Sequence, residues 1–304
     1  MPDQLLPFMF EGTDVRGAVV NLDATWREVL QRHAYPLPVR SLLGEAMAAS
    51  ALLSSTLKFD GTLILQTQAE KREAPVRLLV VECNADLTLR ATAKLGAEWE
   101  AASSLEGHTL ASLVGDGKIV ITLDPKNRED SGQSAYQGVV PLEGTHLAAA
   151  LENYMRRSEQ LDTRIFLAAD ESRAAGLLIQ RLPGDGGHVR ETAASSWADA
   201  EVLAATITSQ ELLTLEPREV MRRLFHEFDL RVFAERPAAF RCTCSRERVA
   251  SMLRTLGRNE VDGILEEQGA VSVNCEFCNQ TYAFDGIDAA QLFAPPAPGS
   301  GARH

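Results

Sequence analysis

The 304-residue sequence lacks the features of several common protein classes. It has no run of about 18 apolar residues, the length that a membrane-spanning helix needs. It also has no excess of basic residues, because Asp and Glu outnumber Lys and Arg and give a net charge of −12. An acidic chain offers no general attraction for phosphate backbones or anionic membranes. We therefore expect a soluble protein whose partners are neither nucleic acids nor membranes.

Signals for export and for common catalytic sites are also missing. The first ten residues contain Asp3 and no basic stretch, so we expect no secretory signal. The G-x-x-x-x-G-K-[ST] phosphate loop, the G-x-S-x-G nucleophile turn and the H-E-x-x-H metal helix do not occur. We expect a protein of the cytosol, where thiols stay reduced, with no catalytic residues and no enzymatic activity.

What the chain does have is 45% hydrophobic residues, enough for a sizeable core, and a length that allows roughly two domains. Alternating apolar segments predict strands, and apolar residues at helical spacing predict helices. We predict an α+β fold with an N-terminal domain, residues 1–184, that mixes sheet and helices. Its predicted strands are 14–22, 62–68, 76–83, 87–93, 118–123, 137–142 and 176–182, and its predicted helices are 24–33, 39–57 and 143–168.

The next region, residues 185–236, contains short predicted helices separated by polar residues. They span Trp197 to Ile207 and Pro217 to Phe228. Helices this short need packing partners to persist, so we predict a helical linker with conditional structure. A small domain follows at residues 237–293, and the Pro- and Gly-containing tail 294–304 is predicted to be disordered.

Four of the five cysteines lie in two close pairs in this last domain. Cys242 and Cys244 form a C-x-C motif, and Cys275 and Cys278 form a C-x-x-C motif about 30 residues later. Two such turns can supply the four ligands of tetrahedral zinc, and an all-sulfur ligand set favours zinc, copper(I) or iron–sulfur clusters. The spacing therefore predicts a tetracysteine metal site, which we assign to one zinc ion per chain.

Local signals predict how the cysteine-containing domain folds around these pairs. Ser245 is a predicted N-cap for a helix 246–256 that Gly257 ends, and Asn259 is a predicted cap for a helix that Gly269 ends. Apolar residues alternate into Cys275 and out of Cys278, which predicts a hairpin with the C-x-x-C motif at its tip.

Other candidate residues favour ordinary structural roles. Cys83 lies in an apolar run and is expected in the sheet core, and His226 is expected at or near the surface because four ligands are already present. The basic side chains near the first pair have two interpretations of equal weight, a solvated basic face or partial neutralisation of a tetrathiolate centre. They are Arg241, Arg246 and Arg248.

The free energies that zinc and disulfides contribute to folding bear on whether the metal is purely structural or part of a redox switch. Zinc contributes on the order of 10–16 kcal/mol of apparent folding free energy in units of this size, whereas a core of about sixty residues supplies about 3–5 kcal/mol. Disulfides within each pair would return only about 2 kcal/mol, while one between Cys244 and Cys275 would constrain far more chain. Oxidation could thus unfold the domain if it forms the short-loop pairs. A purely structural zinc remains the alternative.

Several motifs along nearly the whole chain resemble the heat-shock protein 33 family of redox-regulated molecular chaperones. The matching segments are Cys242-Thr-Cys244-Ser-Arg-Glu-Arg248, Val273-Asn-Cys275-Glu-Phe-Cys278, Tyr282-x-Phe284-Asp285, Tyr136-Gln-Gly-Val-Val-Pro-Leu-Glu-Gly144, Ser158-Glu-Gln160, Gly176-Leu-Leu-Ile-Gln180 and Lys58-Phe-Asp-Gly61.

This resemblance implies an ATP-independent holdase that is inactive when reduced and zinc-bound. It implies activation by Cys242–Cys244 and Cys275–Cys278 disulfides, with zinc release and unfolding of the linker. The implied partners are unfolding client proteins, a second copy of the chain in an oxidised homodimer, and downstream foldase chaperones.

Two other classes of protein remain open: a zinc-ribbon module that binds nucleic acid or protein, and a thiol oxidoreductase using the C-x-x-C motif. The missing βα context disfavours the oxidoreductase.

Overall fold

The computed structural model describes residues 2–57, 60–71, 73–96, 109–115, 117–126, 134–142, 146–183 and 191–294, with residues 191–195 described by their backbone alone. The chain divides into two compact units, Met1–Arg241 and Cys242–His304, and each has an apolar core of its own. The tail beyond Ala294, predicted to be disordered, lies outside the described residues.

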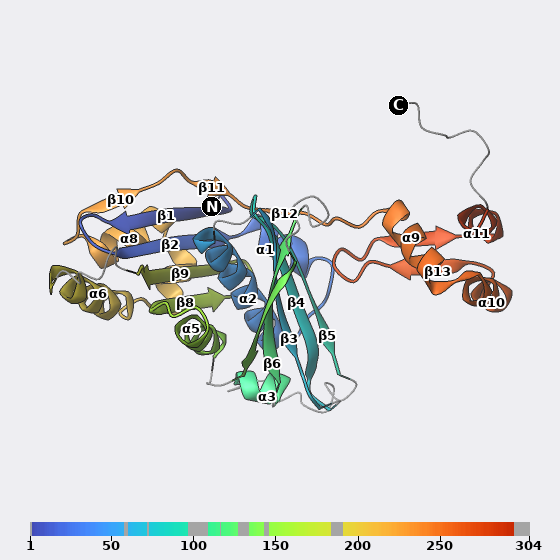
Figure 1. The fold of residues 1–304 in the computed structure, drawn as a ribbon, viewed down its shortest axis with the longest axis horizontal. Coiled ribbons are helices and arrows are strands. Elements are labelled where there is room, and N and C mark those ends of the chain that lie inside the picture. The colour runs from blue at the N-terminus through green and yellow to red at the C-terminus, as the bar shows by residue number, and fades with distance from the viewer. Residues whose placement is uncertain are drawn as a thin grey trace. The chain divides into compact units, whose positions relative to one another are not determined.

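Within the described residues, two six-stranded sheets form the larger unit (Figure 1). The first has the strand order β10-β1-β2-β9-β8, with β11 also paired to β1, and the second has the order β12-β5-β4-β3-β6-β7. All pairs are antiparallel except β12 with β5. The first sheet consists of β1 (Gln4–Phe10), β2 (Val15–Leu22), β8 (Thr163–Ala169), β9 (Ala174–Arg181), β10 (Leu230–Val232) and β11 (Arg236–Pro237). The second consists of β3 (Gly61–Gln68), β4 (Val76–Asn84), β5 (Thr88–Leu95), β6 (Lys118–Pro125), β7 (Tyr136–Pro141) and β12 (Ala239–Phe240).

The burial patterns of the strands reflect which sheet faces are covered. Side chains of β3 alternate between buried and half-buried, as expected for a strand with one face on the core. Side chains of β2 and β9 are buried almost without interruption. This continuity arises because helices cover both faces of the first sheet.

The long helix α2 (Leu37–Thr56) lies between the two sheets and contacts strands of both (Figure 1). Two glycines allow this close packing. A Cβ atom on Gly44 of α2 would lie 2.5 Å from the Cβ of Ala169, and one on Gly176 of β9 would lie 2.9 Å from Leu52 Cδ1. Helices α1 (Ala24–Leu30), α3 (Leu110–Val114) and α5 (Leu147–Arg157) complete this part of the unit.

The predicted helix 143–168 is wrong in its second half. Helix α5 ends at Arg157, Gln160 takes a left-handed conformation with φ 58°, and Thr163–Ala169 forms β8. The β-branched and aromatic residues Ile165 and Phe166 suit a strand, and β9 supplies an antiparallel partner along its whole length. Residues 143–145 lie outside the described residues.

Three helices of the predicted linker pack on the outer face of the first sheet. They are α6 (Glu191–Ala204), α7 (Ser209–Thr214) and α8 (Pro217–Phe225). Phe225 meets the ring of Phe10 edge-on, with ring centroids 5.0 Å apart. Arg173 ties α7 to the domain, because its guanidinium pairs with Asp23 and donates to the carbonyl of Leu213 at 2.6 Å. The chain then adds β10 and β11 to one sheet and β12 to the other.

The smaller unit consists of three helices and a hairpin: α9 (Arg246–Leu256), α10 (Arg258–Gln268), β13 (Val271–Asn274), β14 (Thr281–Phe284) and α11 (Gly286–Leu292). Ser245 accepts a hydrogen bond from the Arg248 amide, which confirms the predicted N-cap. Asn259 is not the cap of α10, because Gly257 at φ 99° already turns the chain and the helix begins at Arg258. Among the described residues of this unit, seven buried ones form the core: Val249, Ala250, Leu253, Val261, Val271, Phe284 and Ala289. Partly buried hydrophobic side chains pack against them: Ile264, Leu265, Val273, Tyr282, Leu292 and Phe293.

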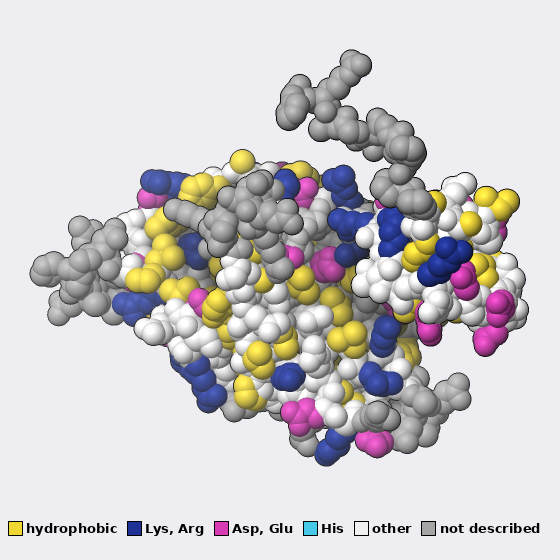
Figure 2. Space-filling model, turned by 45° about the vertical axis from the view of Figure 1, so that its right-hand side comes forward, with side chains coloured by type: hydrophobic (Ala, Val, Ile, Leu, Met, Phe, Trp, Pro, Cys, Tyr) yellow, Lys and Arg dark blue, Asp and Glu magenta, His cyan; other side chains and the backbone are white. Residues whose placement is uncertain are grey.

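The surface carries charges of both signs. Acidic, basic and hydrophobic side chains are interspersed over the face that Figure 2 shows. Among the helices that the structure describes, none combines the length and apolar character needed to cross a bilayer.

A buried carboxyl group in the central helix gives a pH-dependent prediction. Burial raises the pKa of Glu45 to about 7. Because the folded state holds this proton more tightly than the unfolded chain, the contribution of Glu45 to the free energy of unfolding falls as pH rises from about 4.5 to 7. Glu45→Gln should raise the free energy of unfolding by about 2–3 kcal/mol at pH 8 and by less than about 1 kcal/mol at pH 5.

Urea denaturation followed by circular dichroism measures both values. Glu227→Gln is the matched control, because the Glu227 side chain is 77% exposed, and it should change neither value. An unchanged or lower free energy for Glu45→Gln at pH 8 would contradict the prediction.

Candidate metal centre

The first cysteine pair lies in the turn between β12 and α9. Cys242 follows the last residue of the larger unit, and Cys244 directly precedes Ser245, the N-cap of α9. The hydroxyl of Thr243, between the cysteines, accepts a hydrogen bond from Arg248 at 2.7 Å. The start of α9 therefore fixes one side of this turn.

The second pair occupies the tip of the β13–β14 hairpin, as predicted. The Cys275 amide donates to the carbonyl of Gln280 at 2.9 Å, and the Asn279 amide donates to the carbonyl of Cys275 at 2.8 Å. Asn279 adopts a left-handed conformation with φ 58°, which asparagine tolerates better than most residues. These bonds fold the C-x-x-C segment into a tight turn.

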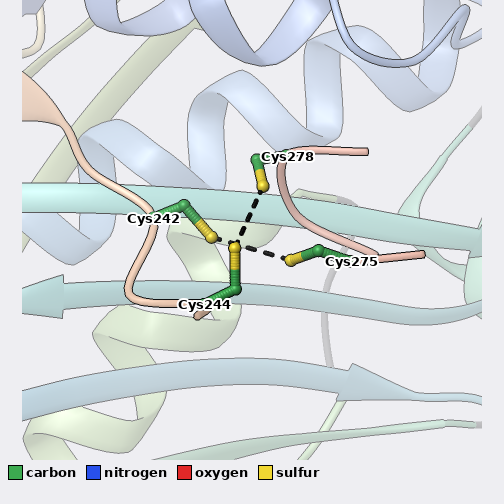
Figure 3. Close-up of side chains that lie close together, drawn as sticks. All are labelled: Cys242, Cys244, Cys275 and Cys278. Carbon is green, nitrogen blue, oxygen red and sulfur yellow. Dashed lines mark hydrogen bonds between the residues drawn. The ribbon is translucent and has the colours of Figure 1, made fainter. Parts of the chain in front are cut away.

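The four sulfur atoms of Cys242, Cys244, Cys275 and Cys278 lie within 4.8 Å of one another. The turns meet sulfur to sulfur, with 3.6 Å between Cys242 and Cys275 and 3.4 Å between Cys244 and Cys278 (Figure 3). Zinc–sulfur bonds of about 2.3 Å in a tetrahedron separate the sulfurs by about 3.8 Å. The donor set therefore fits a tetrahedral metal ion with little movement. Of the residues described, these cysteines make the one group with the close spacing of metal ligands.

The thiols of the second pair have raised pKa values, so protons compete with a metal ion for these sulfurs. Burial raises the pKa of the Cys275 thiol and raises that of Cys278 to about 12. Backbone N–H groups of Phe277 and Cys278 directed at Cys275, and of Gln280 directed at Cys278, partly oppose the rise. Without a cation these two thiols keep their protons at neutral pH, so a metal ion must displace the protons to bind.

A tyrosine hydroxyl completes the surroundings of the sulfurs. Tyr282 of β14 donates a hydrogen bond to the sulfur of Cys244 at 3.1 Å. This contact raises the pKa of the phenol to about 12, so the hydroxyl keeps its proton. Tyr282 lies in the predicted hairpin and in the motif Tyr282-x-Phe284-Asp285 that resembles the family, but no pattern in the sequence links it to Cys244. Its alternation with the buried Phe284 was the one available sign that it faces inward.

The nearby arginines have specific partners of their own. Arg246 pairs with Asp288 at 2.7 Å, donates to the carbonyl of Ala283, and stacks 4.2 Å from the centre of the Phe284 ring. It therefore joins the start of α9 to β14 and α11. Arg241 belongs to the larger unit, where its amide bonds to the carbonyl of Leu89.

The remaining candidates lie in the larger unit and behave as expected. Cys83 is fully buried in β4, where burial raises its pKa to about 12. His226 follows α8 with 65% of its side chain exposed. None of the five cysteines forms a disulfide.

Comparison with known proteins identifies relatives along the whole chain. The family model described as "Hsp33 protein" matches residues 3–285. The "33 kDa chaperonin" of Methylobacillus flagellatus is 47% identical, with 99% of each chain covered. That of Chromobacterium violaceum is 48% identical over 96% of this chain and 94% of the relative.

A solved structure shares the fold. The crystal structure of the 33 kDa chaperonin (heat shock protein 33 homolog) of Thermotoga maritima has a TM-score of 0.76, with 21% identity, and the match covers 95% of this chain and 97% of that one. The predicted fold class and the resemblance drawn from the motifs are both confirmed.

Removing one sulfur ligand tests the four-ligand site. Cys244→Ser should weaken zinc binding about 100-fold, because one ligand of four carries on the order of 3 kcal/mol of the binding free energy. Competition with a chromogenic chelator measures the affinity. Cys83→Ala, which removes a thiol from the larger unit, is the control and should keep one zinc per chain. Tight stoichiometric zinc in Cys244→Ser would contradict the assignment.

Proposed function

The chain belongs to the heat-shock protein 33 family of chaperones, and we propose that it is an oxidation-activated holdase that binds unfolding proteins without ATP. The observation that carries the proposal is the grouping of four cysteine sulfurs within 4.8 Å on two separate turns. In this proposal the reduced chain holds one zinc ion and is inactive. Its place is the cytosol, where a reducing environment maintains the thiols, and it has no catalytic role.

Zinc is the proposed metal because four thiolates suit a soft or borderline ion. When bound, it supplies a cross-link between the C-x-C turn and the hairpin. The seven-residue core of the smaller unit supports this role, because so small a core contributes little folding free energy beside the 10–16 kcal/mol typical of structural zinc, to order of magnitude.

Oxidation would replace that cross-link by disulfides within each turn, Cys242–Cys244 and Cys275–Cys278. Each of these closes a loop of a few residues and returns about 2 kcal/mol in the loop-entropy model. Neither joins the first turn to the second. Loss of the metal is therefore proposed to unfold the smaller unit.

The segment 185–236 is the proposed linker between an N-terminal domain, residues 1–184, and the zinc domain, residues 237–293. In the reduced state α6, α7 and α8 cover apolar side chains of the first sheet, including Phe8 and Phe10. Short helices depend on such packing. Their release would expose this apolar face, which could then bind unfolding clients and a second chain in an oxidised homodimer. Bound clients would later pass to foldase chaperones.

Peroxide treatment tests the activation step. At mildly elevated temperature, hydrogen peroxide should release about one zinc per chain and convert the chain into a suppressor of client aggregation. A metallochromic dye, thiol titration and light scattering of a heat-unfolded client measure the three changes. Peptide mapping should find both short-loop disulfides.

The untreated reduced protein is the control and should leave aggregation unchanged. Zinc release without any effect on aggregation would contradict the holdase. Tight binding of a nucleic acid by the reduced protein at physiological salt would instead favour a zinc-ribbon module.

Hydrogen exchange tests the linker. After oxidation, amides of α6, α7 and α8 should exchange at least about 100-fold faster, because these helices lose their packing. Amides of β3 and β4 in the same molecules are the internal control and should stay protected. Unchanged exchange in the three helices after complete zinc loss would contradict linker unfolding.

A further inference from the structure

Tyr282 connects the apolar core of the smaller unit to one of the metal-site sulfurs. Its ring packs against the core cluster, and its position in β14 is fixed by pairing with Val273 of β13. From there the hydroxyl reaches across to the other turn and donates to Cys244 Sγ at 3.1 Å. The ring packs against the core and the hydroxyl contacts the sulfur, so a substitution that removes only the hydroxyl can test the second role by itself.

The sulfurs of Cys275 and Cys278 have donors of a different kind. Backbone N–H groups of Phe277 and Cys278 face Cys275, and the N–H of Gln280 faces Cys278. These N–H donors belong to the backbone of the turn, so they do not depend on which side chains the turn carries. The donor to Cys244 is a side chain, so it can be removed while the backbone of both turns stays the same.

We propose that Tyr282 is a positioning residue that restrains oxidation of Cys244 through its O–H···S hydrogen bond. The proposal rests on the proposed function only in taking peroxide as the oxidant. In the step concerned, the Cys244 thiolate attacks one peroxide oxygen, an S–O bond forms, the O–O bond breaks, and hydroxide leaves and is protonated to water. A second cysteine thiolate then displaces the sulfenic hydroxyl group as hydroxide, which forms the disulfide.

The hydrogen bond slows the first step for two reasons. It stabilises the negative charge on the sulfur and so lowers its nucleophilicity, and it fixes the direction in which the sulfur points. Outer donors of this kind orient ligands and tune their reactivity at metal sites, and their loss typically changes metal affinity or activity by 10–100-fold, to order of magnitude. Because a thiolate sulfur has other lone pairs that can attack the peroxide oxygen, we expect an effect at the lower end of that range.

Tyr282→Phe tests the proposal in protein reconstituted with zinc. The observed rate of zinc release is measured against peroxide concentration with a metallochromic dye. The slope reports attack on sulfur, and the intercept reports spontaneous metal loss. The slope should rise roughly tenfold. Trapping of sulfenic acid with a dimedone probe, followed by peptide mapping, should show a larger share of label on Cys244 relative to Cys275 and Cys278.

Tyr136→Phe is the matched control, because it removes a half-exposed phenol hydroxyl in the larger unit and should leave the slope unchanged. An unchanged slope with a raised intercept in Tyr282→Phe would overturn the proposal, since the hydroxyl would then only hold the site together. Failure of the variant to take up zinc would overturn it in the same way. If peroxide oxidises neither the wild type nor the variant, the redox function itself fails.

Discussion

The smaller unit depends on one constraint, that four cysteine sulfurs from two turns stay within 4.8 Å of one another. Its seven buried residues form too small a core to hold three helices and a hairpin without help. Two further contacts join parts of this unit: the Tyr282 hydroxyl donates to Cys244 of the first turn, and the Arg246 guanidinium of α9 pairs with Asp288 of α11. The ion pair is partly exposed, and exposed ion pairs contribute little. In the proposed function, the metal held by the sulfur cluster is therefore the element on which this unit's fold depends.

The same cluster bears on the larger unit through the continuity of the chain. Cys242 follows Arg241, whose amide is bonded to β5, and the two-residue strand β12 lies directly before it. Upstream, β10 and β11 add five residues to the edge of the first sheet. Such short edge strands open more readily than the core strands β2 and β9. Cys242 therefore follows directly on a short edge pairing of the larger unit, that of β12 with β5.

The sequence could predict the features that depend on residues close together in the chain. The C-x-C and C-x-x-C spacing, the Ser245 cap and the alternation around the hairpin tip concern neighbouring residues, and all lie where expected. One error is local, because Gly257 and not Asn259 caps α10, and the others concern distant partners. Thr163–Ala169 is a strand because β9 lies beside it, and β10 and β12 pair with strands far away in the sequence. The bond from Tyr282 to Cys244 joins residues 38 apart, so only the fold reveals it.

The sulfur positions also determine when each disulfide pattern can form. In the folded unit the short sulfur contacts, 3.4 and 3.6 Å, run between the turns. Disulfides formed there would keep the turns linked and the unit folded. In an unfolded chain the shortest loops close most easily, which favours Cys242–Cys244 and Cys275–Cys278. In the proposed mechanism, oxidation within the turns therefore requires that metal loss loosen the unit before the second disulfide forms. The hydrogen bond of Tyr282 joins Cys244 of the first turn to β14 of the hairpin that carries the second pair.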